Sequence, residues 1–318
     1  MAEPVLLVDG LNLYTRHFVA NPSMSDLGNH VGGAVGFLRA IQYLCDIIKP
    51  KKVYVVWEGG GSPRRRAIYP DYKKSRKPPK LNRFYDGDIP DTVENRNYQL
   101  ALLIELLKYV PVCQIYISDC EADDVIGYMA RRKLINDDVI IVSSDKDYYQ
   151  LISDRVRQWS PGQKKFVDKD KVFDKFGVRP RNFCTVRCFV GDASDSIPGV
   201  RGAGFKTMVK RFPCVTEDRD VEIQEIISLS ENMLEQKIKL YKNIYDSRDI
   251  VKRNWRLMYL DTQNLSATQI QKINNMINTF VPSRNKIGML RALIREGIKT
   301  FDADRFFLSL NSSLRQDR

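Results

Sequence analysis

Carboxylate side chains recur in this sequence in short groups, and these groups are its feature most able to carry out chemistry. The densest group lies between residues 118 and 147, where three acids open a run with helical spacing and two more follow a short β-branched run. Ligands of α/β sheets bind beyond the carboxyl ends of the strands, so we expect all five acids at one site. They are Glu121, Asp123, Asp124, Asp145 and Asp147.

Helix capping offers a local explanation for some of these acids. Ser118 and Glu121 have the spacing of a capping box, and Asp145 is suited to cap a short helix that follows it. Capping does not explain why further acids follow other predicted strands or precede a glycine-rich turn. Those acids are Asp9, Glu58, Asp192 and Asp195.

Carboxylates gathered in this way require a cation to offset their repulsion. Oxygen ligands without histidine or thiolate suit Mg²⁺ or Mn²⁺, and two such ions can generate hydroxide and stabilise the leaving oxygen of a phosphodiester. The two histidines, His17 and His30, lie outside the acidic groups in sequence, so we do not expect a histidine general base. The acids therefore predict a two-metal site that hydrolyses phosphodiesters.

The composition indicates a nucleic-acid partner. The 51 Lys and Arg against 39 Asp and Glu give a net charge of +12, which attracts polyanions, although a surface charged for solubility is the alternative. No apolar run approaches the length of a membrane span and residues 1–8 lack the pattern of a signal peptide, so we expect a soluble cytoplasmic protein. The six cysteines lack paired zinc spacing and are expected to be reduced.

Residues 62–83 combine arginine and lysine with tyrosine and proline. Positive charge can hold a nucleic-acid backbone while aromatic rings stack on bases, so this segment is a candidate surface for single strands or phosphates. A disordered basic linker is the alternative. The predicted nucleic-acid contacts in this segment are Arg64, Arg65, Tyr72, Lys73 and Arg76.

A second candidate nucleic-acid surface follows Asp195. Gly199, Gly202 and Gly204 have the spacing of a helix-hairpin-helix, and they let the backbone approach a ligand closely before Lys206 adds a charge. Such a hairpin grips the DNA backbone without reading sequence. An ordinary glycine-rich turn is the alternative.

Apolar periodicity predicts an α/β fold with a mostly parallel central sheet flanked by helices. Strands are expected at 5–8, 53–57, 112–117 and 139–142, with a hairpin at 156–159 and 165–167, and helices at 34–48, 95–109, 168–176 and 181–190. We expect two domains. Residues 1–180 would form a nuclease core that includes the basic segment 62–95, and 181–318 a helical domain with the helix-hairpin-helix at 190–212.

As a set, these motifs resemble those of the 5′-nuclease superfamily, which includes flap endonucleases, the 5′ nuclease domain of bacterial DNA polymerase I and bacteriophage 5′ exonucleases. The resemblance covers roughly residues 5–210 and implies a PIN-like nuclease core. The hairpin at 158–161 and the helical tail are similar in particular to bacteriophage ribonuclease H, which removes RNA primers in replication. The motifs are Glu121-Ala122-Asp123-Asp124, Ser144-Asp145-Lys146-Asp147 and Gly191-Asp192-Ala193-Ser194-Asp195, with Asp9 and the glycine hairpin to Lys206.

The resemblance also implies a role for each acidic position. One metal ion would be held or approached by Asp9, Glu58, Glu121, Asp123 and Asp145, and the second by Asp147, Asp192 and Asp195, with Asp124 in the same cluster. Glu58 departs from the aspartate usual in the family, and this lengthens one ligand arm.

Among the basic residues, Tyr72, Lys73 and Arg76 match the base of a helical arch that admits the 5′ strand and contacts the scissile phosphate. Lys73, Arg76 and Asp145 are therefore the expected catalytic residues. The hairpin carbonyls would add a K⁺ site.

The resulting expectation is a metal-dependent 5′-3′ exonuclease and structure-specific flap endonuclease that leaves 5′-phosphates. Its expected partners are branched or nicked DNA, RNA–DNA duplexes and a single-strand-binding protein, with no membrane, and the protein itself is expected to be a monomer. A non-catalytic DNA-structure-binding protein that uses the acids only to bind cations is the alternative.

Overall fold

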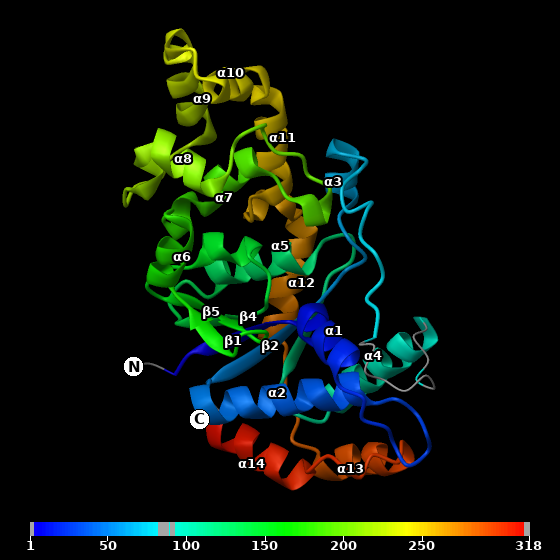
Figure 1. The fold of residues 1–318 in the computed structure, drawn as a ribbon. Coiled ribbons are helices and arrows are strands. Elements are labelled where there is room, and N and C mark those ends of the chain that lie inside the picture. The colour runs from blue at the N-terminus through cyan, green and yellow to red at the C-terminus, as the bar shows by residue number, and fades with distance from the viewer. Residues whose placement is uncertain (1–2, 82–88, 90–92, 315–318) are drawn as a thin grey trace.

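A six-stranded sheet lies at the centre of the fold, in the spatial order β3-β2-β1-β4-β5-β6 (Figure 1). The computed structural model describes residues 3–81, 89 and 93–314. The first five strands are parallel, and β6 runs antiparallel to β5 as the far arm of the predicted hairpin. The strands are β1 (Val5–Asp9), β2 (Lys52–Trp57), β3 (Cys113–Tyr116), β4 (Val139–Val142), β5 (Val156–Ser160) and β6 (Lys165–Val167).

Helices cover both faces of this sheet, because alternate residues of each buried strand point to opposite sides. Leu6 and Val8 of β1 pack into one core with the first set of helices, and Val5 and Leu7 into a second core with the other set. The first set is α1 (Gly10–Ala20), α2 (Gly32–Ile48), α4 (Val93–Leu107), α13 (Lys286–Arg295) and α14 (Ala303–Ser313). The second set is α5 (Ala122–Tyr128), its π-helical continuation (Met129–Lys133) and α12 (Ala267–Asn278).

A helical layer with its own core stands beyond the carboxyl ends of the strands (Figure 1). Its helices α7, α8 and α9 are joined by the glycine-rich turn and short 3₁₀ turns, and α11 runs back from this layer toward the sheet. The basic segment begins at α3 (Pro63–Ile68), which contacts α11. The layer contains α7 (Pro180–Val190), α8 (Phe205–Arg211), α9 (Ile223–Asn232), α10 (Lys239–Asp246) and α11 (Arg248–Met258), and α6 (Lys169–Phe176) precedes it.

The C-terminal helices differ from the expected division at residue 180. Met289 of α13 and Phe306 and Leu310 of α14 are fully buried in the same core as Leu6 of β1, and Ile273 of α12 is buried on the opposite face of the sheet. The chain therefore leaves the sheet region for α7–α11 and then returns to it. Helix α12 packs beside β3 and α14 packs on α2, so the apolar residues of these helices bury their surface there and not against the helical layer.

Helix α1 is not among the elements predicted from the sequence, although a local signal for it exists. Asp9 caps it by accepting the backbone N–H of Asn12 at 3.1 Å, and Leu13, Tyr14 and Phe18 are buried with helical spacing. Among the described residues, no helix is long and apolar enough to cross a membrane.

Candidate active site

The carboxyl ends of three adjacent parallel strands bring the first acids together. Asp9 ends β1, Glu58 follows β2 on one side of it, and Asp145 follows β4 on the other side. Ser143 links two of these strand ends, because its hydroxyl donates to Asp9 Oδ2 at 3.1 Å and accepts the backbone N–H of Asp145 at 3.1 Å. The order of the strands therefore places the three carboxylates at one edge of the sheet, as expected for this class of fold.

The beginning of α5 adds Glu121 and Asp123 to the same edge. The Tyr148 hydroxyl lies 2.6 Å from Asp123 Oδ1 and 3.3 Å from Asp9 Oδ2, so it joins the acids of two elements. The backbone N–H of Ala122 donates to Glu58 Oε2 at 3.3 Å. The five acids expected to hold or approach one metal ion thus lie together at the entrance to α5.

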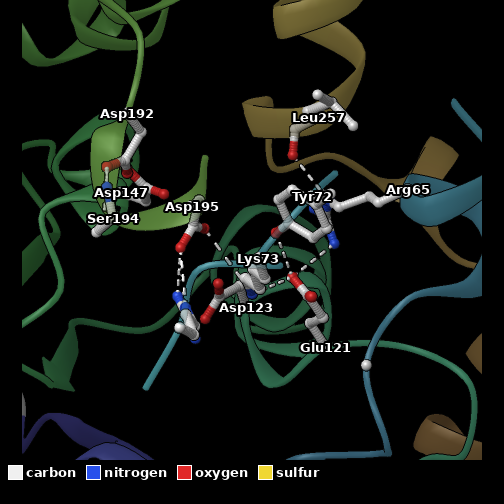
Figure 2. A network of polar contacts seen from close by, with 12 residues as sticks. Arg65, Tyr72, Lys73, Glu121, Asp123, Asp147, Asp192, Ser194, Asp195 and Leu257 are labelled. Carbon is white, nitrogen blue, oxygen red and sulfur yellow. Dashed lines mark hydrogen bonds and ion pairs between the residues drawn. The ribbon is translucent and has the colours of Figure 1, made fainter. Parts of the chain in front are cut away.

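A second acidic group lines a hollow of about 530 Å³. Asp147, Asp192 and Asp195 each offer a carboxylate oxygen, and these oxygens all lie within 4.8 Å of one another. Asp145 from the first group lines the same hollow as these three acids. The chain therefore places all the acids assigned to the second ion in a single triad (Figure 2). Asp145 in the hollow connects this triad with the first group.

Burial and mutual repulsion make several of these carboxylates hard to ionise. Burial, followed by the charge of Asp123, raises the pKa of Asp9 to about 7 and that of Asp145 to about 6. Burial, followed by the charge of Asp145, raises the pKa of Asp147 well above its ordinary value. Hard divalent cations bind oxygen ligands of this kind, and the arrangement therefore fits such ions.

Basic side chains already neutralise part of each group (Figure 2). Lys73 Nζ lies 2.8 Å from Glu121 Oε2 and 4.0 Å from Asp195 Oδ2, and the Tyr72 hydroxyl donates to the same Glu121 oxygen at 2.9 Å. Arg76 Nη2 lies 2.6 Å from Asp195 Oδ1. Burial alone would raise the pKa of Glu121, but Lys73 and Arg65 hold it below its ordinary value. Lys73 therefore lies between the two acidic groups.

Arg65 and Asp124 form a buried ion pair with each other, although Arg65 was expected at the nucleic-acid surface. Arg65 is only 3% exposed, and its guanidinium binds both oxygens of Asp124, at 2.6 and 2.7 Å. It also contacts Glu121 at 3.1 Å and donates to the Leu257 carbonyl at 2.7 Å. This corrects the expectation that Arg65 contacts nucleic acid, because its donors face inward. Arg65 binds both oxygens of Asp124, so Asp124 helps to fix Arg65 beside Glu121 and does not present a free oxygen to the acidic cluster.

Two residues of the site were not singled out from the sequence. Tyr148 bridges Asp9 and Asp123, and Arg187 of α7 lies between Asp192 and Asp147, with N–O distances of 2.6 and 3.6 Å. Arg187 precedes Asp192 by a little more than one helical turn, a spacing that could have indicated the pair. Tyr148 had no such signal, because its partners come from two distant segments.

The glycine hairpin joins α7 to α8 as predicted. A Cβ atom on Gly199 would lie 2.0 Å from the Val190 carbonyl oxygen, so this position requires glycine. Gly202 has a φ of +86°, which also favours glycine, whereas among the described residues, apart from its two chain neighbours, no atom lies within 4 Å of the Cβ position of Gly204. Lys206 is exposed on α8, and Arg64 is exposed on α3 with one guanidinium contact to Asn264. The part of the basic segment at 82–88 and 90–92 lies outside the described residues.

Comparisons with known proteins agree with this geometry. Residues 4–177 match the sequence family described as the 5′-3′ exonuclease, N-terminal resolvase-like domain. The flap endonuclease Xni of Shewanella sp. (strain MR-4) is 29% identical over 281 residues, which cover 86% of this chain and 97% of that protein. The 5′-3′ exonuclease of Aquifex aeolicus (strain VF5) is 33% identical over 209 residues, which cover 65% of this chain and 68% of that protein.

The fold is similar to a solved structure of the bacteriophage T5 flap endonuclease in a complex with DNA and metal ions. The TM-score is 0.68 at 22% sequence identity, and the match covers 86% of this chain and 98% of that one. Identity at this level supports the likeness of the fold alone.

Proposed function

Because the chain belongs to the 5′-3′ exonuclease family, we propose that it is a metal-dependent 5′-3′ exonuclease and flap endonuclease that hydrolyses phosphodiester bonds and leaves 5′-phosphates. The observation that carries this proposal is the meeting of two acidic groups, because Asp145 of the first group lines one hollow with the three acids of the second, and Lys73 and Arg76 pair with acids of these groups. A cluster with this much negative charge is costly in a protein that only binds DNA, because it repels the phosphates.

We assign the two groups to two divalent ions, Mg²⁺ or Mn²⁺. Asp9, Glu58, Glu121, Asp123 and Asp145 would hold one ion, and Asp147, Asp192 and Asp195 the other. Bound there, the ions would supply a hydroxide nucleophile and stabilise the leaving oxygen. The carbonyl oxygens of the glycine hairpin would bind a third cation, K⁺.

Lys73 and Arg76 have the positions needed to hold the scissile phosphate. Both cations now pair with acids of the site, Lys73 with Glu121 and Arg76 with Asp195. Divalent ions bound to those acids would compete for their oxygens and free the two side chains for a phosphate. The Tyr72 ring lies under Lys73 Nζ, 5.0 Å from the ring centroid to the nitrogen, and limits where that nitrogen can point.

The proposed substrates are nicked or branched DNA and RNA–DNA duplexes with a 5′ end. The basic segment and the glycine hairpin lie on either side of the acidic loop 191–195, and the backbone N–H of Lys73 donates to the Asp195 carbonyl at 2.9 Å. A single substrate can therefore contact the hairpin with its duplex and the basic segment with its free strand. We propose that the enzyme acts as a monomer.

Cleavage assays test this function directly. The purified protein is incubated with 5′-flap, nicked and RNA-primed duplexes with Mg²⁺ or with chelator, and we expect cleavage only with metal. Asp145→Asn should lower the cleavage rate by about 10³-fold or more, because it removes a charge from the metal site. Asp138→Asn is the matched control, because Asp138 is exposed at the opposite end of β4.

The assay also separates the proposed enzyme from a protein that only binds DNA structures. Cleavage that persists in chelator, or full activity of Asp145→Asn, contradicts the two-metal mechanism. Tight binding of flap DNA without cleavage under every metal condition supports the non-catalytic alternative.

A further inference from the structure

Unpaired cations gather around the glycine hairpin on three elements. In the part of the chain that the structure describes, none of them forms an ion pair within 4.0 Å, and all are exposed. This contrasts with the active site, where Lys73, Arg76 and Arg187 all pair with acids. The unpaired residues are Arg201 in the hairpin, Lys206 and Lys210 on α8, and Lys237, Lys239 and Lys242 at α10.

Helix α10 is attached directly to the hairpin. The Asn243 side chain donates to the Arg201 carbonyl at 2.9 Å, and a Cβ atom on Gly202 would lie 3.8 Å from Leu240 Cδ1. Leu240 is buried in the core of the helical layer, so α10 has a defined position beside the hairpin. A ligand that reaches the hairpin backbone therefore meets α10 next.

The lysines of α10 begin beside its contact with the hairpin. Residues three and four apart are neighbours on a helix surface, so Lys239 lies beside Asn243, and Lys242 lies beside Lys239 and farther from the hairpin. Lys237, Lys239 and Lys242 also line one hollow of about 480 Å³, where Asp246 is the sole acid among the lining residues. The three lysines therefore form one cationic patch, which is joined to the hairpin through Lys239 and its neighbour Asn243.

The shape of this patch favours an extended polyanion over a small one. The eight residues of α10 span about 12 Å, and a strand of duplex carries one phosphate per roughly 3.4 Å over such a length. Lysines spaced along a helix can each contact one of several consecutive phosphates, whereas they do not surround a single small anion. Because α10 is attached to the hairpin, we expect these phosphates to belong to the duplex that the hairpin binds.

We propose that α10 is a second duplex-binding surface, in which Lys239 and Lys242 with Lys237 contact phosphates farther from the cut than the hairpin reaches. This inference rests on the proposed function for its substrate, a duplex with a 5′ end, but it can be tested without cleavage. The α10 surface would add sequence-independent affinity and would lengthen the duplex that the enzyme requires for tight binding.

Binding assays with chelator present test the surface without turnover. Fluorescence anisotropy is measured on flap DNA with short duplex arms, and on flap DNA whose arms are one helical turn longer. A neutralised phosphate contributes a slope of about −0.9 in log K against log salt, so losing two contacts corresponds to an affinity loss of up to about 60-fold at 0.1 M salt. We expect Lys239→Gln with Lys242→Gln to weaken binding of the long substrate by about 8- to 60-fold and to reduce its salt slope by about 1 to 2.

Two further variants make the result specific. Lys108→Gln with Lys272→Gln removes the same amount of charge from two exposed positions, one just after α4 and one on α12. This control should leave the affinities for the long and the short substrate within twofold of wild type. Lys206→Gln, at the hairpin itself, should weaken binding of both the long and the short substrate.

Several outcomes would overturn the proposal. It is refuted if the Lys239→Gln, Lys242→Gln double variant loses less than threefold in affinity for the long substrate. It is also refuted if that variant loses affinity equally for both substrates, or if its salt slope is unchanged. A double variant that binds DNA normally but loses binding to anionic phosphatidylserine vesicles also refutes it, and would assign the patch to another polyanion. Failure of the proposed function shows separately, as absence of cleavage in Mg²⁺ with the length-dependent binding intact.

Discussion

Replacing Arg65 tests whether the arginine supports the site or binds DNA. Its guanidinium is buried on Asp124, Glu121 and the Leu257 carbonyl, and it joins α3, α5 and α11. Arg65→Met keeps much of the stem but leaves the Asp124 carboxylate buried without a charged partner, because the Glu121 backbone N–H is its other hydrogen-bond donor among the described residues. Removing one partner of a buried ion pair costs about 3–5 kcal/mol. For a protein of this size, that loss lowers the midpoint of thermal unfolding by about 10 °C.

The comparison that isolates this effect uses the neighbouring arginine. Arg64 is exposed, and within the described part of the chain its side chain has one polar contact, with Asn264 at 3.4 Å, so Arg64→Met should change stability by less than about 0.5 kcal/mol. Urea unfolding followed by circular dichroism measures both variants, and anisotropy well below the unfolding midpoint measures flap-DNA affinity. We expect Arg65→Met to retain the affinity of the folded wild type.

A second substitution tests the physical reason for the loss. Combining Arg65→Met with Asp124→Leu removes both charges, so it should recover at least half of the stability lost by Arg65→Met alone. If Arg65→Met instead matches Arg64→Met in stability and loses DNA affinity, the arginine contacts DNA and the structural reasoning is wrong.

Three further predictions concern pH, the hairpin and metal. Burial lowers the pKa of His17 to about 4, so the unfolded chain binds the extra proton first and the contribution of His17 to the unfolding free energy should fall by up to about 3 kcal/mol as pH drops from about 6.5 to 4. Urea unfolding of wild type and His17→Gln across this range measures this contribution as the difference between the two proteins, which removes the opposite contribution of Asp9 and Asp145. Gly199→Ala should lower duplex affinity and the unfolding midpoint because its Cβ meets the Val190 carbonyl, whereas Gly204→Ala should leave the midpoint unchanged. Metal-free Asp147→Asn should unfold at a higher temperature than wild type, because it relieves the repulsion that raises the pKa of Asp147, and should gain less from added Mg²⁺.

Local patterns in the sequence were enough to predict the sheet and the edge at which the acids meet. β-branched runs identify strands such as Val139–Val142, and parallel strands present their carboxyl ends on one side, so Asp9, Glu58 and Asp145 follow as neighbours. The spacing of Gly199, Gly202 and Gly204 likewise predicts the hairpin, because the requirement for glycine is local at Gly199, where the Val190 carbonyl is close, and at Gly202, where φ is positive.

Local patterns do not specify contacts between distant segments. The sequence of α3 shows three arginines in a row but not that Arg65 turns inward, because that depends on how α3 packs against α5 and α11. Tyr148 joins Asp9 and Asp123 only once β1, α5 and the loop after β4 have assembled.

The return of α12–α14 to the sheet has the same origin. Their apolar stripes are compatible with packing against any apolar face, and the free energy of burying them depends on which face the rest of the chain leaves uncovered. The positions of the ionisable residues and of the strand ends can thus be predicted from local patterns. Which ionisable groups face each other depends on the packing of segments far apart in the chain, and only the folded protein shows it.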